Sequence, residues 1–63
     1  MTSEECIIYR RRAGWSPAQL ARNAGLCERT VELFEAGRTA PRPVTLVALR
    51  RAFRTAGALD GAA

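Results

Sequence analysis

Apolar residues recur at intervals of three and four along most of this chain, which is the spacing that puts side chains on one face of an α-helix. Four separate segments show this pattern: residues 3–13, 17–24, 28–36 and 44–56. No segment shows the strict alternation of a half-buried strand. The pattern therefore predicts an all-α domain of four helices.

The residues at the segment ends support these boundaries. Thr2 and Glu5 have the spacing of a capping box, and so do Ser16 and Gln19. Pro17 stands at the first position of its helix, where an N–H group is not needed. Glycine, which readily adopts the left-handed conformation that ends a helix, follows each segment, as Gly14, Gly25, Gly37 and Gly57.

The helical spacing also predicts which side chains face the core. The predicted inner positions are Cys6, Tyr9, Arg10 and Ala13; Leu20, Ala21 and Ala24; Val31 and Phe34; and Leu46, Leu49, Ala52 and Phe53. Two isoleucines, Ile7 and Ile8, fall outside the inner face of the first helix. They are therefore expected to be exposed unless a partner or the tail covers them.

Only three residues, Gly25-Leu26-Cys27, separate the second and third helices. A link this short forces the helices to cross steeply, and the small side chain of Ala21 permits close contact. Gly25 lets the chain turn with positive φ, while Val31 and Phe34 follow six and nine residues later. This is the spacing of a helix-turn-helix, here over residues 17–36.

The segment GWSPAQLARNAGLCERTVELFEAGRTAPRP resembles the XRE family of lambda repressor-like and Cro-like DNA-binding domains. The matching positions are Gly14, Ser16, Leu20, Ala21, Gly25, Val31, Phe34, Glu35, Gly37, Arg38 and Pro41. The resemblance covers about residues 5–53 and implies a five-helix fold. That fold is shortened to four helices here, because no fifth helix is predicted after Gly57. The domain is thus expected to span residues 1–57, and residues 58–63 are expected to form a flexible tail.

The resemblance implies that the third helix, residues 28–36, lies in the major groove of DNA. The candidate base-reading residues on its outer face are Glu28, Arg29, Glu32 and Leu33. Arg29 has the chemistry to contact guanine, or it pairs with a neighbouring glutamate. Glu28 either accepts a hydrogen bond from cytosine or favours the helix N-terminus electrostatically. Leu33 meets either a thymine methyl group or a protein partner.

Phosphate contacts are expected from the loop residues Arg38, Thr39 and Arg42, and from Ser16 and Arg22 around the second helix. Thr30 either bonds a phosphate or caps locally. The family often buries the glutamate found here as Glu35 against an arginine of the first helix. The resemblance therefore implies an ion pair between Glu35 and Arg10.

Three positions depart from the family pattern. Pro17 replaces a glutamine at the start of the second helix and has no N–H to offer a phosphate. Cys27 replaces the serine-like cap of the third helix and is a poorer acceptor. Glu28 and Glu32 make the recognition helix acidic, which is expected to repel phosphates and favour base selectivity over general affinity.

Composition narrows the function further. The chain has 63 residues, enough for one domain with a marginal core. All ten basic residues are arginine, and the net charge is +4. This balance is consistent either with an anionic partner such as nucleic acid or with ordinary solubility.

Several functional classes are excluded by the residue inventory. Without histidine, Cys6 and Cys27 cannot form an ordinary zinc site. Cys6 is expected to pack in the core, and Cys27 is either a plain thiol or an oxidant-sensitive one. No paired carboxylates or glycine-rich phosphate loop are evident, so neither an enzyme nor a cofactor is predicted. No apolar run reaches the roughly 18 residues of a membrane span, and a cytoplasmic protein, nucleoid-associated when bound to DNA, is expected.

These observations predict a sequence-specific DNA-binding regulator of the type found in bacteria and phages. The resemblance implies a homodimer that binds an inverted repeat, most simply as a repressor of its own promoter. The alternative is a protein-binding module that has kept the fold, for instance an anti-activator. It would use the acidic third helix with Leu33, or the isoleucines Ile7 and Ile8.

Overall fold

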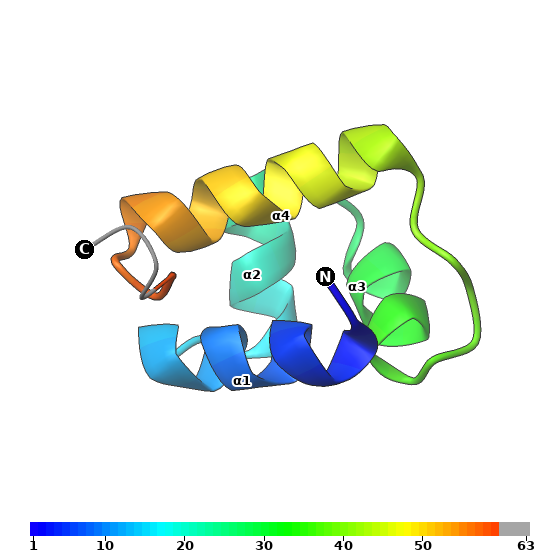
Figure 1. The fold of residues 1–63 in the computed structure, drawn as a ribbon, viewed down its shortest axis with the longest axis horizontal. Helices are drawn as coiled ribbons and strands as arrows, with labels where there is room; N and C mark the ends of the chain where they lie inside the picture. Colours follow the sequence, from blue (N-terminus) through cyan, green and yellow to red (C-terminus); the bar gives the residue numbers. More distant parts are fainter. Residues whose placement is uncertain (60–63) are drawn as a thin grey trace.

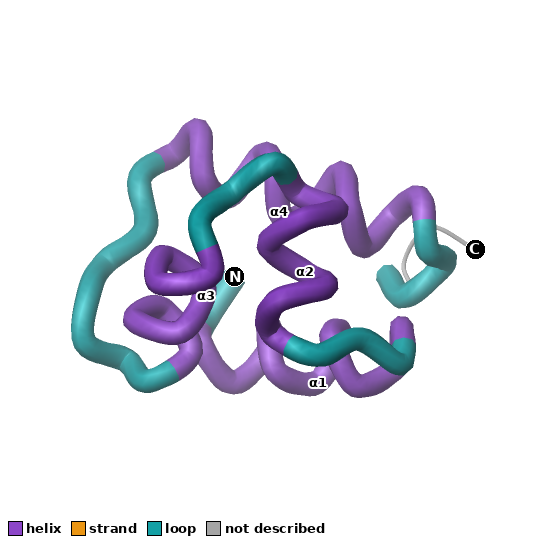
Figure 2. The backbone as a smooth tube through the Cα atoms, turned by 180° about the vertical axis from the view of Figure 1, so that it is seen from behind, coloured by secondary structure: helices purple, strands orange, loops and turns teal. Residues whose placement is uncertain are grey.

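Four helices make up most of residues 1–59, the part of the chain that this computed structural model describes (Figure 1). They are α1 (Ser3–Ala13), α2 (Pro17–Ala24), α3 (Glu28–Glu35) and α4 (Pro43–Thr55). No strand occurs within these residues, so the predicted all-α fold of four helices is confirmed. α1 and α4 run along opposite sides of the molecule, with α2 and α3 between them, and Figure 2 shows the same arrangement from behind.

Two of the four helices begin with the predicted capping boxes. At α1, the Glu5 N–H donates to Thr2 Oγ1 at 3.1 Å, and the Thr2 N–H donates to Glu5 Oε1 at 2.9 Å. At α2, Ser16 and Gln19 make the same exchange at 3.2 and 2.8 Å. Each box satisfies two backbone N–H groups that have no partner within the helix.

The core lies between the helices and consists of side chains from all four. Its buried members are Cys6, Leu20, Ala21, Val31, Phe34, Leu49, Ala52, Phe53 and Ala58. Phe53 lies at its centre, with the Tyr9 ring at 5.6 Å and the Trp15 ring at 6.1 Å between centroids. The predicted inner faces of all four helices are therefore the ones that pack together, although Tyr9, Arg10, Ala13, Ala24 and Leu46 are only partly buried.

The end of the chain differs from the expected tail. Ala58 is buried, and its N–H donates to the Phe53 carbonyl oxygen at 2.9 Å, because the backbone turns back at the end of α4. Leu59 is partly buried against the core. The expectation of a flexible tail is wrong for these two residues, and the remainder of that tail, residues 60–63, lies outside the described residues.

The two isoleucines of α1 also differ from each other. Ile8 is 50% exposed, as the helical spacing predicts. Ile7 is half-buried rather than exposed. The wheel places Ile7 at the flank of the inner face, and a flank position is partly covered wherever a neighbouring helix packs beside it.

The turn between α2 and α3 has the geometry that the three-residue link requires. Gly25 has φ 71° and ψ 31°, in the left-handed region. The next residue, Leu26, donates its N–H to the Ala21 carbonyl oxygen at 2.8 Å, which closes the end of α2. A Cβ atom at Gly25 would meet no atom within 4 Å, so the backbone conformation alone demands glycine.

We therefore expect Gly25→Ala to lower the free energy of unfolding by about 1 kcal/mol through left-handed backbone strain alone. Gly25→Asn should cost less, because asparagine tolerates this conformation better than alanine. Urea unfolding followed by circular dichroism measures both values. An alanine variant as stable as the wild type, or an asparagine variant less stable than the alanine one, would contradict this account.

Candidate nucleic-acid interface

The candidate recognition helix α3 is short, and packing keeps it folded. A helix of eight residues is marginal by itself, since few hydrogen bonds offset the cost of nucleation. Its N-cap residue, Cys27, makes no side-chain capping bond. Val31 and Phe34 are almost completely buried, and α3 packs chiefly on α2 and also on α1. One face of α3 is thus fixed to the protein, which leaves the opposite face to solvent.

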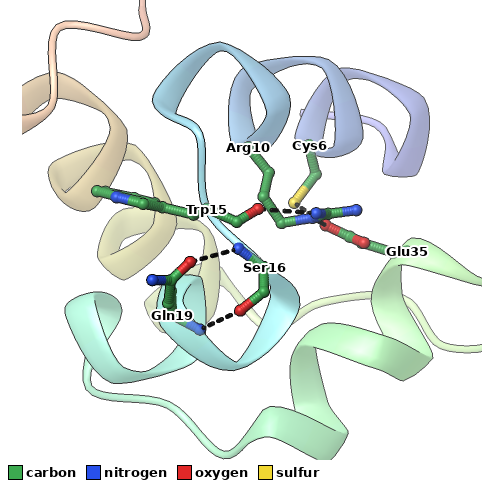
Figure 3. Close-up of polar contacts among 6 residues, drawn as sticks. All are labelled: Cys6, Arg10, Trp15, Ser16, Gln19 and Glu35. Carbon is green, nitrogen blue, oxygen red and sulfur yellow. Dashed lines mark hydrogen bonds and ion pairs between the residues drawn. The ribbon is translucent and has the colours of Figure 1, made fainter.

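The C-terminal end of α3 is held by Glu35. Arg10 Nε in α1 lies 2.7 Å from Glu35 Oε2, so the ion pair implied by the family resemblance is present (Figure 3). The exposed fractions of the two side chains are only 15% and 10%. Arg10 Nη1 also donates to the Trp15 carbonyl oxygen at 2.9 Å, in the turn between α1 and α2. A single guanidinium thus links α1, the start of α2 and the end of α3.

Cys6 belongs to the same cluster. Its Sγ donates to Glu35 Oε2 at 3.6 Å, and the residue is fully buried. Burial, together with the neighbouring Glu35 carboxylate, raises the pKa of the Cys6 thiol to about 12, while the Arg10 cation opposes the shift. Cys6 is a core thiol, as predicted, and Cys27 is an exposed free thiol.

The outer face of α3 carries Glu28, Arg29 and Glu32, which are all exposed. The alternative that Arg29 pairs with a neighbouring glutamate is not realised, because no ion pair joins them among residues 1–59. The guanidinium of Arg29 is therefore available to a ligand. Its two carboxylate neighbours set the local charge of this face slightly negative.

The loop from α3 to α4 lies beside this helix and forms a groove with it. The groove has a volume of about 360 Å³ and is lined by Thr30, Leu33, Phe34, Thr39, Ala40, Pro41, Arg42 and Thr45. Thr30 and Leu33 are half-buried there, whereas Thr39 and Arg42 are exposed. The structure thus brings two predicted site residues of α3, Thr30 and Leu33, together with two from the loop, Thr39 and Arg42.

The remaining candidates lie outside this groove. Arg38 is exposed at the start of the loop, and its N–H donates to the Leu33 carbonyl oxygen at 3.0 Å. Ser16 is exposed, but its N–H and Oγ both take part in the capping box with Gln19. Arg22 is exposed in the last turn of α2. None of these three lines the groove.

Two residues near these positions were missed by reasoning from the sequence. Thr45, in the first turn of α4, lines the groove, and only the path of the loop brings it there. Gln19 is exposed, and its side-chain oxygen is fixed by Ser16, so its amide NH₂ group is held in a defined position (Figure 3). The capping-box spacing of Ser16 and Gln19 was the available signal for this second residue.

Other kinds of site find no support in residues 1–59. No group of three or more cysteine, aspartate or glutamate side chains is placed to hold a metal ion within them. None of the described helices has the length and apolar character needed to cross a membrane.

Comparison with known proteins identifies one family. A family model described as a helix-turn-helix domain matches residues 8–60, which include α2, the three-residue turn and α3. No curated protein and no solved structure matches the chain.

We expect Glu35→Gln to lower the free energy of unfolding by about 2 kcal/mol, because it removes the carboxylate that accepts from the half-buried Arg10. Glu32→Gln is the matched control: the same change on the same helix, at an exposed position, should alter stability by less than about 0.5 kcal/mol. Thermal unfolding of both variants tests this. Equal destabilisation would show that loss of any negative charge on α3, rather than the ion pair, is responsible.

The raised pKa of Cys6 predicts a loss of stability at alkaline pH. In the unfolded chain this thiol ionises near its ordinary pKa of 9.0, whereas in the folded protein its pKa is about 12. The stability due to the thiol is therefore intact below pH 9 and falls between pH 9 and 12, with a slope approaching about 1.4 kcal/mol per pH unit. Urea unfolding at a series of alkaline pH values measures it, with Cys6→Ser as a control that donates to Glu35 without titrating. Parallel curves for the two proteins would refute the prediction.

Proposed function

The chain belongs to the helix-turn-helix domain family, and from this premise we propose that it is a sequence-specific DNA-binding regulator of transcription. The observation that carries the proposal is the way in which α3 is held against the rest of the domain. Its inner face is buried, its C-terminal end is tied to α1 by Glu35, and its outer face presents Arg29, which has no ion-pair partner among residues 1–59, to solvent. A short helix held this way can enter a major groove without losing its shape.

Base reading is proposed for the outer face of α3. Arg29 has the fork of donors that matches the O6 and N7 acceptors of guanine. Glu28 and Glu32 have carboxylates that accept from the N4 amino group of cytosine. Leu33, half-buried at the rim of the groove, offers an apolar contact for a thymine methyl group.

Phosphate binding is proposed for the residues around that helix. Thr39 and Arg42 of the loop line the groove together with Thr30 of α3, and Arg38 is exposed where the loop begins. Ser16 and Arg22 of the α2 region are proposed to contact further phosphates. Such contacts carry most of the affinity and fix the register of the helix in the groove.

The acidic side chains give this interface an unusual balance. Glu28 and Glu32 repel phosphates, so contacts from α3 alone bring little affinity for DNA of arbitrary sequence. Binding then requires the correct bases to pair with these carboxylates, in addition to the loop contacts. We infer that the protein gains selectivity from them at the expense of general affinity.

A homodimer on an inverted repeat is proposed for the assembly on DNA. One two-turn helix reads few base pairs, and a second copy doubles the contacts when half-sites lie about 34–36 Å apart, one turn of DNA. The resemblance to the XRE family supports this arrangement and the role of a repressor of its own promoter. Ile8, 50% exposed on α1, is a candidate for the surface between the two copies.

A second candidate function is a protein-binding module that has kept the fold. Two observations favour it: Ile8 is exposed on α1, and Glu28 and Glu32 lack ion-pair partners among residues 1–59. A partner with a basic, apolar surface would suit them. A failure to select any DNA sequence, together with capture of such a partner through α3, would favour this function over the first.

The decisive experiment starts by selecting the preferred site from a random duplex library, followed by binding measurements across a salt series. We expect one enriched sequence and an affinity that falls steeply as salt rises. A library that yields no enriched sequence would overturn the proposal of sequence-specific binding. Footprinting of the enriched site tests the half-site spacing.

Two arginine variants separate the proposed roles. Arg29→Ala should reduce the difference in binding free energy between the correct and the wrong base at one position by about 1–3 kcal/mol. The measurement compares the affinity for the enriched site with that for each single-base substitution of it. Arg42→Ala should weaken binding to all duplexes alike and reduce the salt slope by about one. Equal, sequence-independent losses from both variants would contradict the assignment of base reading to Arg29.

A further inference from the structure

The solvent-facing side of α4 differs in character from the interface proposed above. Val44 and Val47 are 70% and 54% exposed, and with Ile8 they are the large hydrophobic residues that residues 1–59 leave most open to solvent. Arg50, Arg51 and Arg54 follow them on the same side of the helix and are also exposed. We refer to these five residues as the α4 outer face.

The charge of the α4 outer face is of one sign only. α4 contains no acidic residue. The guanidinium groups of Arg50, Arg51 and Arg54 have no ion-pair partner within the described part of the chain. The three arginines and Val47 enclose a shallow hollow of about 220 Å³. An apolar side chain thus forms part of a depression that is otherwise bounded by unpaired cations.

The position of this surface separates it from the candidate DNA interface. The C-terminal half of α4, which carries the three arginines, lies at the end of the molecule opposite α3 and the loop (Figure 1). Figure 2 shows the same separation from behind. DNA bound along α3 and the loop therefore leaves the arginine-bearing half of the α4 outer face open to a second partner.

We propose that the α4 outer face binds an acidic amphipathic helix of another protein. Val44, Val47, Arg51 and Arg54 are spaced at i, i+3, i+7 and i+10, the spacing with which one helix packs along another. They span about 15 Å, or roughly three turns. Carboxylates of the partner would pair with the guanidinium groups, which accept them in bidentate geometry, and its apolar side chains would cover the two valines.

Two other occupants fit these observations less well. A second copy presenting the same face would set three guanidinium groups against three others, without a carboxylate on either α4 to balance them. The phosphates of a nucleic acid would match the arginines but would leave Val44 and Val47 uncovered. A partner that is both acidic and apolar satisfies the whole surface.

The test uses synthetic helical peptides about five turns long as probes, each with a fluorescent label for anisotropy. The first has leucines at positions that form one stripe and glutamates on both sides of it. The second has the same composition with the leucines dispersed around the helix, and the third has glutamine in place of glutamate. We expect the first peptide to bind at least about tenfold more tightly than either of the others, because the surface needs both features.

Matched variants locate the binding surface. Arg51→Gln/Arg54→Gln should weaken binding of the first peptide about tenfold, as should Val47→Asn. Arg38→Gln/Arg42→Gln removes the same charge from the loop and should leave peptide binding unchanged while it weakens DNA binding. All the substituted residues are exposed, and circular dichroism verifies that each variant folds.

Four results would overturn the proposal. Equal binding of the striped and dispersed peptides, or equal losses in both double variants, would reduce it to attraction by net charge. A loss of DNA affinity in Arg51→Gln/Arg54→Gln as large as that in the loop variant would assign the face to nucleic acid. A concentration-dependent dimer, seen by sedimentation and abolished by Val47→Asn, would assign it to a second copy. Failure of the DNA selection described above would leave the peptide result unaffected.

Discussion

The carboxylate of Glu35 is the group on which the position of α3 depends. It accepts from Arg10 Nε at 2.7 Å and from Cys6 Sγ at 3.6 Å, and both donors come from α1. Arg10 in turn donates to the Trp15 carbonyl oxygen, immediately before the capping box that starts α2. Since α3 is only two turns long and has no side-chain N-cap, these contacts and the burial of Val31 and Phe34 determine its orientation. The outer face of α3 consequently has a fixed orientation relative to α1 and α2.

The same constraint explains why the acidic residues of α3 have different roles. Glu35 lies at the flank of the buried face, where a carboxylate is tolerated because a cation and a thiol donate to it. Glu28 and Glu32 lie on the exposed face and have no such partner among residues 1–59. Their charges therefore act on whatever approaches α3. The net charge of α3 does not distinguish these roles: the Glu35 carboxylate is structural, whereas those of Glu28 and Glu32 are open to a ligand.

Local features of this fold could be predicted from the sequence, whereas features set by chain reversal could not. The capping boxes of Thr2 and Ser16 depend on residues three positions apart, and the turn at Gly25 depends on three consecutive residues. The sequence alone is therefore enough to predict these features. Arg10 and Glu35 are 25 positions apart, and no spacing rule connects them. Their ion pair was therefore predicted from the family resemblance alone. The burial of Ala58 and the place of Thr45 in the groove follow from how the chain turns after α4 and before it. Neither the burial of Ala58 nor the position of Thr45 could be known without the three-dimensional path of the chain.

The distribution of arginine shows why net charge alone does not indicate which surface of the protein binds a partner. The exposed face of α3 has one arginine between two glutamates, whereas the end of α4 has three arginines and no acid. This cluster of exposed positive charge on α4 therefore lies away from the helix proposed to read DNA. In the proposed complex, affinity for DNA would come from the neighbouring loop, where Arg38 and Arg42 are exposed. The DNA-reading role is proposed for α3 in spite of its charge, because α3 is the helix that the turn at Gly25 and the Glu35 carboxylate hold with one face free.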